Sequence, residues 1–468
     1  MTPEISKLGS DASCSAKDVG RTFWRFAVPS IIAMLVSGMY QVIDGVFVGY
    51  FVGESGLAGV NLALPMLSVV IGFGLLVGMG GGSVLSNFRG KNNETAVNQT
   101  LGTSMYLMLF GGLILGIVLS VLGGTMLHLQ GGDNPPGEEY LAVMSYGCVI
   151  TIGATALPIL IRNDNKPTLA TLFIVLGALI NIALDYTLIG LYGLGLEGAA
   201  MATLIAQVIT CILCVGYFLR ASRNIFVGLS AFNGRIALRV MQLGASGLVM
   251  FIYFGFTLSI HNTQLASYGG LTHVAAFSIV GYIASLYYFF AEGLAGGTQP
   301  PVSFYSGAKQ YHKTLQTLTL ATSVIIISGI AMVVVLNLFP TVFVGLFTHE
   351  QGLMAVAAKG LRLHLFTLYL DGLFFLVAIY FIAVEKAGAA MFVSLGNILI
   401  QLPFLWFLPR QLGVEGVWLA VPLSNVVFAC AVIPIFLHSI YKVKLSSDLQ
   451  TVQYGVTAIS VFLSRWQY

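Results

Sequence analysis

The sequence predicts an all-α integral membrane protein with twelve transmembrane helices in two pseudo-symmetric lobes of six. Three observations support this fold class. The 468 residues are 57% hydrophobic and only 8% charged, with a mean hydropathy of +0.90, whereas soluble domains carry about 25% charged residues. Apolar segments of about 20 residues, the length that crosses a bilayer, recur along the whole chain. The second half of the chain also repeats features of the first.

The apolar segments place the helices along the chain. We expect their cores at 23–50, 57–85, 100–123, 140–161, 168–190, 196–219, 240–267, 274–300, 316–339, 356–383, 388–408 and 414–440. The first twenty residues are polar and lack the short apolar core of a cleavable signal. The N-terminus is therefore expected to stay in the cytoplasm.

The basic residues predict the orientation of the helices. With the N-terminus inside, all of the 21 Lys and Arg residues except Lys359, Arg362 and Arg410 fall in the terminal segments or in loops on the inner side. Cytoplasmic loops of membrane proteins carry an excess of Lys and Arg. We therefore expect a multi-pass protein of the plasma membrane, or of the inner membrane in a Gram-negative bacterium, with both termini in the cytoplasm.

The two halves of the chain resemble each other. The stretch "LGLEGAAMATLIAQV" (194–208) aligns with "LGVEGVWLAVPLSNV" (412–426), which pairs Glu197 with Glu415. Duplicated halves usually form two bundles that move about a central binding site. We expect an N-terminal cytoplasmic segment 1–20, an N-lobe 21–220 with a cation site, a basic cytoplasmic linker 221–239, a C-lobe 240–440 and a cytoplasmic tail 441–468.

Two motifs that suggest other kinds of site are better explained by helix packing. Cys211 and Cys214 form a CxxC inside an apolar helix without a second ligand pair. The stretch "GMGGGS" (78–83) lacks the preceding strand of a nucleotide loop, and small residues are common where membrane helices approach closely. HExxH, Walker and hydrolase nucleophile motifs are absent from the sequence. We therefore expect no enzyme activity, no cofactor and no nucleic-acid partner.

Ionisable residues inside the predicted spans are few. Asp44 lies in the first span and Asp185 in the fifth, while Glu292 and Asp371 lie in the eighth and tenth. The middles of the first six spans contain no Lys or Arg. A charged residue at the bilayer centre costs about 2.5–3.5 kcal/mol on insertion scales. The first half therefore holds two costly acids without a fixed cationic partner.

Helical geometry predicts that these two acids lie at one depth. Asp44 and Asp185 each come about nine residues before an outer turn, and Thr203 comes about nine after one, so all three lie about 14 Å below that surface. Asn181 is one turn from Asp185 on the same helix face, and Tyr40 is one turn from Asp44. Oxygen ligands suit Na⁺, and two close carboxylates that resist joint ionisation can instead take up a proton.

We therefore predict a site for H⁺ or Na⁺ formed by Asp44, Asn181, Asp185 and Thr203, and no other metal site. In the second half, Asp44 aligns with His261 and Thr203 with Val421, while Asp185 aligns with Pro403 or Phe404. Because this oxygen cluster is not duplicated, it is not needed merely to build a six-helix bundle.

The chain resembles the multidrug and toxic compound extrusion (MATE) family, in particular its prokaryotic branch. The resemblance covers residues 20–440 and rests on these stretches together: "AVPSIIAML", "YQVIDGVFVG", "IRNDNKP", "NIALD" followed by "GLEGAA", and "GTQPPVSFYSGAK". It implies two six-helix bundles that form a V-shaped central cleft. It also implies export of lipophilic, often cationic compounds, driven by inward H⁺ or Na⁺.

The resemblance also implies roles for particular residues. The cation site of that branch matches Asp44, Asn181, Asp185 and Thr203, and a proline that lets the first span bend when the acid is neutralised matches Pro29. A proline removes a backbone hydrogen bond and can kink a helix. Some relatives carry a second cation site in the other lobe. Asp371 resembles its acid, and His261 stands near the expected position of another, so these two form a candidate second site.

The hypothesis that follows is a secondary active multidrug antiporter, which would confer drug resistance by xenobiotic export. H⁺ or Na⁺ at Asp44 and Asp185 displaces a cationic substrate held near Tyr40 and Asp44, and the first span bends at Pro29. The expected partners are small-molecule substrates and the lipid bilayer, and a monomer is expected to suffice. The alternative is a flippase for a lipid-linked precursor with a related two-lobe fold, which several Lys or Arg in the cavity would favour.

Overall fold

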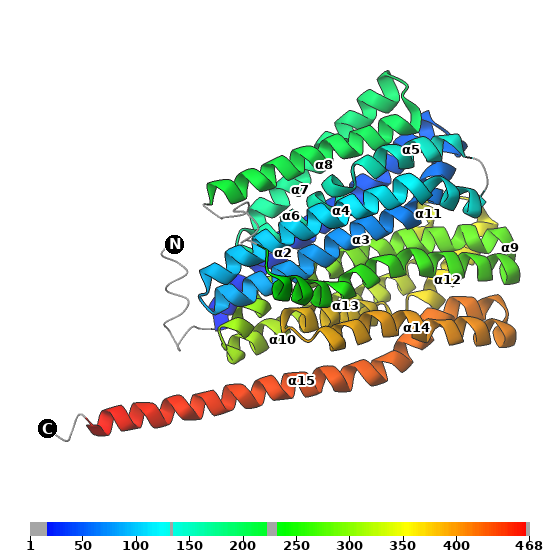
Figure 1. The fold of residues 1–468 in the computed structure, drawn as a ribbon. Helices are drawn as coiled ribbons and strands as arrows, with labels where there is room; N and C mark the ends of the chain where they lie inside the picture. The colour runs from blue at the N-terminus through cyan, green and yellow to red at the C-terminus, as the bar shows by residue number, and fades with distance from the viewer. Residues whose placement is uncertain (1–15, 132–133, 222–231, 465–468) are drawn as a thin grey trace.

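The computed structural model describes residues 16–131, 134–221 and 232–464, and every element in these ranges is helical. Most of the expected N-terminal segment and of the basic linker lies outside the described residues. The elements in chain order are α2 (Ala16–Phe51), α3 (Glu54–Gly90), α4 (Glu94–Gly131), α5 (Pro135–Tyr146), α6 (Cys148–Asn163), α7 (Pro167–Asp185), the π-helix η1 (Tyr186–Leu191), α8 (Gly195–Arg220), α9 (Gly234–Gly307), α10 (Tyr311–Leu338), α11 (Pro340–Gly345), α12 (Gln351–His364), α13 (Leu368–Ala383), α14 (Ala387–Leu412) and α15 (Val414–Ser464) (Figure 1).

These helices supply the twelve predicted spans. Among the described residues, nine helices are long and apolar enough to cross a membrane, and the bent pairs α5–α6 and α12–α13 raise the number to eleven. The helix α9 contains two spans, because Gly270 interrupts it with a φ of 72°; counting both gives twelve. Each span covers one of the predicted ranges, so the predicted fold class is confirmed.

The turns between spans repeat from one half to the other. We call the end of the bundle with the α3–α4 turn the base, and the end with the α2–α3 turn the rim. At the rim, Gly53 and Gly270 follow the first span of each half with φ of 85° and 72°, a conformation that favours glycine. At the base, Asn92 and Lys309 occupy equivalent turns, both with φ of 55°. The internal repeat is therefore visible in the backbone as well as in the sequence.

The fourth span is bent in both halves. The axis turns by 63° between α5 and α6, and by 49° between α12 and α13. The fifth span of the first half has an irregularity of its own, because α7 passes directly into the π-helix η1 after Asp185. The last span is extended: the expected tail begins inside α15, which continues as one helix to Ser464 and runs beyond the bundle (Figure 1).

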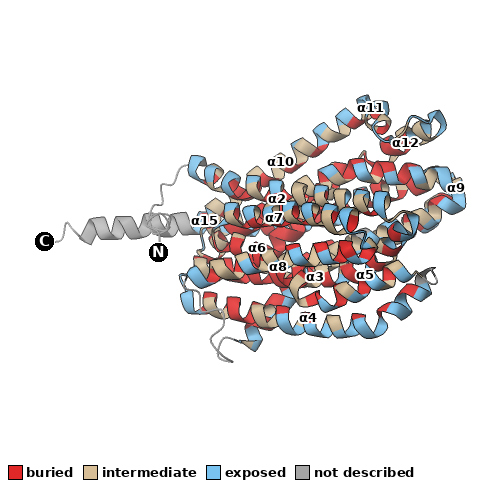
Figure 2. Cartoon of the chain, turned by 90° about the horizontal axis from the view of Figure 1, so that it is seen from above, coloured by how far each residue is buried: buried red, intermediate tan, exposed pale blue. Residues whose placement is uncertain are grey.

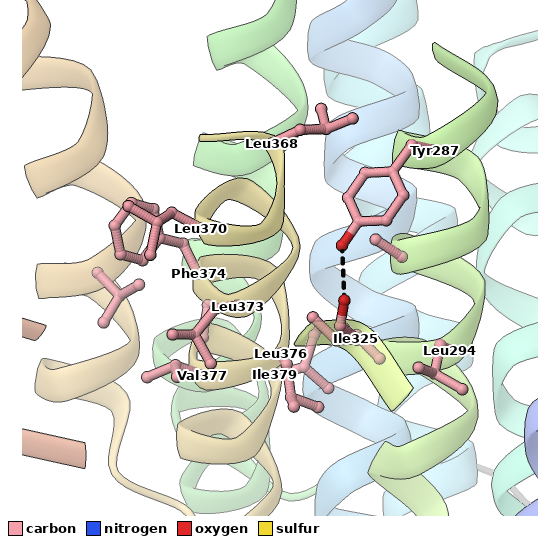
Figure 3. Close-up of a cluster of buried hydrophobic side chains, with 14 of the residues drawn as sticks. Tyr287, Leu294, Ile325, Leu368, Leu370, Leu373, Phe374, Leu376, Val377 and Ile379 are labelled. Atoms are coloured by element: carbon pink, nitrogen blue, oxygen red, sulfur yellow. Dashed lines mark hydrogen bonds between the residues drawn. The ribbon is translucent and has the colours of Figure 1, made fainter. Parts of the chain in front are cut away.

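Each lobe has its own hydrophobic core. One cluster of buried side chains comes from α2–α8 and the other chiefly from α9–α15, and buried positions line the inside of both bundles while exposed ones face outward (Figure 2). In the C-lobe core, the Tyr287 hydroxyl donates to the Ile325 carbonyl at 3.0 Å (Figure 3). The base halves of α2 and α3 join this second core through Phe23, Ala27, Met79 and Val84.

The two lobes approach closest along the base half of α3. A Cβ added to Gly244 of α9 would overlap the Leu76 carbonyl, and one added to Gly80 of α3 would overlap the Val240 carbonyl. This close approach confirms the packing interpretation of the "GMGGGS" stretch.

Two buried hydrogen bonds also cross from lobe to lobe in this region. The Ser83 hydroxyl of α3 donates to the Ile382 carbonyl at 2.7 Å, and the Gln299 amide of α9 donates to the Met79 carbonyl at 2.8 Å. The contact between the lobes near the base is therefore made largely by backbone atoms.

Replacing Gly244 with alanine should destabilise the protein by forcing the lobes apart at the base. Overpacking of this kind costs about 1–3 kcal/mol. Gly255 on the same span has open space at its Cβ position, so Gly255→Ala is the matched control and should be neutral or slightly stabilising. Thermal melting of both purified variants checks the prediction, and equal melting temperatures would contradict it.

Candidate cation site

The two acids inside the spans of the N-lobe come from two helices that pack against each other. Asp44 lies in the rim half of α2 and is partly exposed, whereas Asp185 is the last residue of α7 and is fully buried. The π-helix η1 begins at the next residue. Such single π turns frequently occur at functional sites, where they change the direction of a side chain.

The two carboxyl groups lie close enough to influence each other electrostatically. Within the described part of the chain, Asp44 Oδ1 and both carboxyl oxygens of Asp185 are buried without a hydrogen-bond partner. Buried polar atoms in proteins nearly always have a partner. Two neighbouring carboxyl groups whose buried oxygens lack a donor in this part of the chain make a candidate site for a proton or a metal cation.

The other predicted ligands surround this pair. Asn181 is buried one turn before Asp185, and its amide nitrogen lies 3.5 Å from the Thr203 hydroxyl of α8. Its side-chain oxygen is a further buried acceptor without a donor in the described residues. Tyr40 interacts electrostatically with both acids. The structure thus gathers all five residues around one point of the N-lobe.

Sequence analysis missed a sixth residue at this point, Tyr140. It is buried in α5, and its phenol interacts with Asp44, Asp185 and Tyr40. The sequence places it in the first turns of the fourth span, five residues after the start of α5. Its polar group near the rim end of a span was the available signal.

The arrangement can hold a small cation but offers no catalytic group. Carboxylate, amide and hydroxyl oxygens from α2, α7 and α8 are hard ligands of the kind that bind Na⁺. The same carboxyl pair can hold one proton between its two members, because two adjacent carboxylates in a low-dielectric region resist joint ionisation.

Pro29 lies in the base half of α2, about four turns from Asp44. Its carbonyl accepts a hydrogen bond from the Thr171 hydroxyl of α7 at 2.7 Å. The next residue, Ser30, is buried, and its hydroxyl lies 3.3 Å from Nη1 of Arg162. Hydrogen bonds from neighbouring helices thus hold both residues at the place where the proline interrupts the helix.

The two residues of the candidate second site have different neighbours. Asp371 accepts a hydrogen bond from Asn425 at 2.7 Å. His261 is fully buried, bonds to the Thr257 carbonyl at 2.8 Å and stacks on Phe277. Asn425 was detectable in the sequence, because it aligns with the polar Gln207 of the first half.

An indirect route still joins these two residues. Tyr253 interacts electrostatically with Asp371 and forms hydrogen bonds to Thr257 and Gln401. Thr257 is the residue whose carbonyl contacts His261. In the C-lobe, His261 and Asp371 are therefore linked through Thr257 and Tyr253 rather than by a contact of their own.

A fold of two duplicated six-span lobes with an uncompensated acid pair inside one of them defines a membrane transport protein. The comparisons make the class specific: the MatE family model matches residues 29–187 and 245–407. The chain belongs to the MATE family, whose members are transporters and not enzymes. It is consequently a multi-pass membrane protein.

Individual relatives support this assignment. The multidrug export protein MepA of Staphylococcus saprophyticus is 25% identical over 416 residues, which cover 87% of this chain and 91% of the relative. The solved structure of an outward-facing multidrug resistance MATE transporter of the MOP superfamily has a TM-score of 0.85 at 23% identity, with 91% and 97% of the two chains covered. A MATE structure in a straight conformation has a TM-score of 0.86 at 22% identity, with 95% and 99% covered.

Removing one charge of the acid pair should stabilise the fold at alkaline pH. In Asp185→Asn, the repulsion between two buried carboxylates is absent, so the melting temperature at pH 8 should rise by a few degrees. At low pH, protonation of carboxyl groups removes this repulsion from the wild type as well, so the difference should shrink. The exposed Glu139 gives a control, Glu139→Gln, that should show neither effect. A pH-independent difference for Asp185→Asn would contradict the interpretation.

Proposed function

We propose that this protein is a secondary active antiporter that exports lipophilic, often cationic compounds in exchange for H⁺ or Na⁺. The observation that carries the proposal is that Asp44 and Asp185 lie close together and that their buried oxygens have no hydrogen-bond donor in the described residues. The name of the relative MepA, a multidrug export protein, supports the substrate class. The cation site consists of Asp44, Asn181, Asp185 and Thr203.

Coupling in this proposal results from competition for the same negative charge. A cationic substrate near Tyr40 and Asp44 is attracted while the acid pair is ionised. Arrival of H⁺ or Na⁺ neutralises the pair, so the attraction is lost and the substrate leaves. A membrane potential of about 100 mV adds about 2.3 kcal/mol for each charge moved inward, which favours entry of the coupling ion.

The helix α2 is suited to transmit this event, because it belongs to both lobes. Near the rim it carries Asp44 into the N-lobe site, and near the base its residues Phe23 and Ala27 join the C-lobe core. Pro29 lies between the two regions. Bending at Pro29 therefore changes the position of the cation site relative to the C-lobe contact.

The direction of transport follows from the basic residues. We place the base in the cytoplasm, since the loops at that end carry most of the Lys and Arg residues. Substrate then enters at the base and leaves at the rim, and the coupling ion moves in the opposite direction across the plasma membrane. The flippase alternative gains no support at the N-lobe site, where acids rather than basic side chains meet.

Asp44→Asn should abolish drug-resistance complementation while leaving membrane insertion intact. Ethidium efflux from vesicles with separately imposed pH and Na⁺ gradients then identifies the coupling ion. The exposed Glu54 at the rim provides the control Glu54→Gln, which should transport normally. Wild-type resistance in cells expressing Asp44→Asn would refute the role of this residue.

Pro29→Ala should slow transport without weakening cation binding. Alanine restores the backbone N–H that proline lacks and therefore opposes bending of α2. Pro65 lies inside α3, and Pro65→Ala serves as the matched control. Initial rates of ethidium efflux, compared with ²²Na⁺ or proton uptake by the purified protein, check this prediction. Equal efflux rates for Pro29→Ala and the wild type would argue against a hinge.

A further inference from the structure

Glu292 is an acid within a predicted membrane span to which the cation site gives no role. It lies in the second span of α9, and its side chain is half-buried. No donor in the described residues hydrogen-bonds to its carboxylate, and no ion pair within 4.0 Å involves it. A carboxylate at such a depth is costly to keep, so its retention at the lobe interface requires an explanation.

The positive charge that interacts with Glu292 belongs to a residue of the other lobe. Arg162, near the base end of α6, interacts electrostatically with Glu292. Its guanidinium also reaches across the interface: Nη1 lies 3.3 Å from the Ser30 hydroxyl, and a Cβ at Gly296 would lie 3.2 Å from the same atom. Its Nε is buried without an acceptor in the described residues. The two charges attract each other but are not locked into an ion pair.

Near Glu292, the backbone of α9 packs tightly against the backbone of α2, so the base is closed at this level. A Cβ at Gly293 would lie 2.6 Å from the Ile31 Cα, and one at Gly297 would lie 2.7 Å from the Ala27 Cα. The spans therefore touch through backbone atoms, directly beside Pro29 and Ser30. Any movement of α9 away from α2 at this level separates Glu292 from Arg162, because the two residues belong to different lobes.

An opened base would thus leave the Glu292 carboxylate without its counter-charge. A carboxylate within a membrane span is costly when no positive charge lies near it. A positive charge on a molecule entering from the base would relieve this cost. When the base closes again, the guanidinium returns and competes with that molecule for the same carboxylate.

We propose that Glu292 is a binding residue for the positive charge of organic cations that enter at the base, and that Arg162 is a tethered competitor that displaces them on closure. The proposal rests on the antiport function above and names a second substrate contact in the C-lobe. It predicts that removing the charge of Glu292 and removing the charge of Arg162 change cation binding in opposite directions. A contact that only holds the lobes together would instead make both substitutions act alike.

The test is equilibrium binding of ethidium and tetraphenylphosphonium to the purified full-length protein, at low salt and without an ion gradient. Glu292→Gln should weaken the binding of both probes about tenfold, and Glu292→Asp should restore part of it. Arg162→Gln should tighten binding several-fold, because the competing cation is gone. Glu385 pairs with Arg239 within the C-lobe, so Glu385→Gln is the matched control and should bind like the wild type.

The outcomes separate this proposal from the function it rests on. If Glu292→Gln and Arg162→Gln change binding in the same direction, or if neither changes it, Glu292 is not a substrate contact, and the antiport proposal is unaffected. If the wild type binds neither probe, the assigned substrate class is wrong, and the role of Glu292 is refuted with it.

Discussion

A carboxylate inside a membrane is stabilised by a nearby positive charge, and in the described part of the chain no Lys or Arg pairs with Asp44 or Asp185. Most features of the N-lobe site relate to this constraint. Asp185 is fully buried at the point where α7 changes into a π-helix, and Asn181 and Thr203 add oxygens rather than fixed cations. A permanent Lys or Arg there would stabilise the fold but would leave no role for an exchangeable ion. Under the proposed function, the site is therefore destabilising when no cation occupies it.

The helix α2 connects the charge at Asp44 to the contact between the two lobes. The helix α2 contributes to the site near the rim and to the C-lobe core near the base, with Pro29 between the two. The lobes meet through glycines such as Gly80 and Gly244, where backbone lies against backbone. Contacts of this kind resist overpacking yet contain few interlocking side chains. They allow two rigid bundles to share an interface and still move relative to each other.

The sequence was sufficient for features that depend on periodicity and on composition. Hydropathy located all twelve spans, and equal distances from the rim turns anticipated that Asp44 and Asp185 would lie together. It was not sufficient for features that depend on the packing of distant segments. Tyr140 belongs to α5, and its approach to Asp44 and Asp185 depends on how this helix packs within the lobe. The approach of Arg162 to Glu292 depends on how the two lobes dock, and no local pattern in the sequence records that docking.

The hydrogen bonds between the lobes have a consequence for the role of water. Ser83 and Gln299 donate to the carbonyls of Ile382 and Met79 in the opposite lobe, and both bonds must break if the base opens. A separated donor or acceptor in a dry interface would lose about 1–3 kcal/mol. Opening of the base is therefore feasible only if water hydrates the separated donors and acceptors as they part. The rate of the conformational cycle then depends on water activity, and osmolytes excluded from the interface should hold the transporter in its closed-base form.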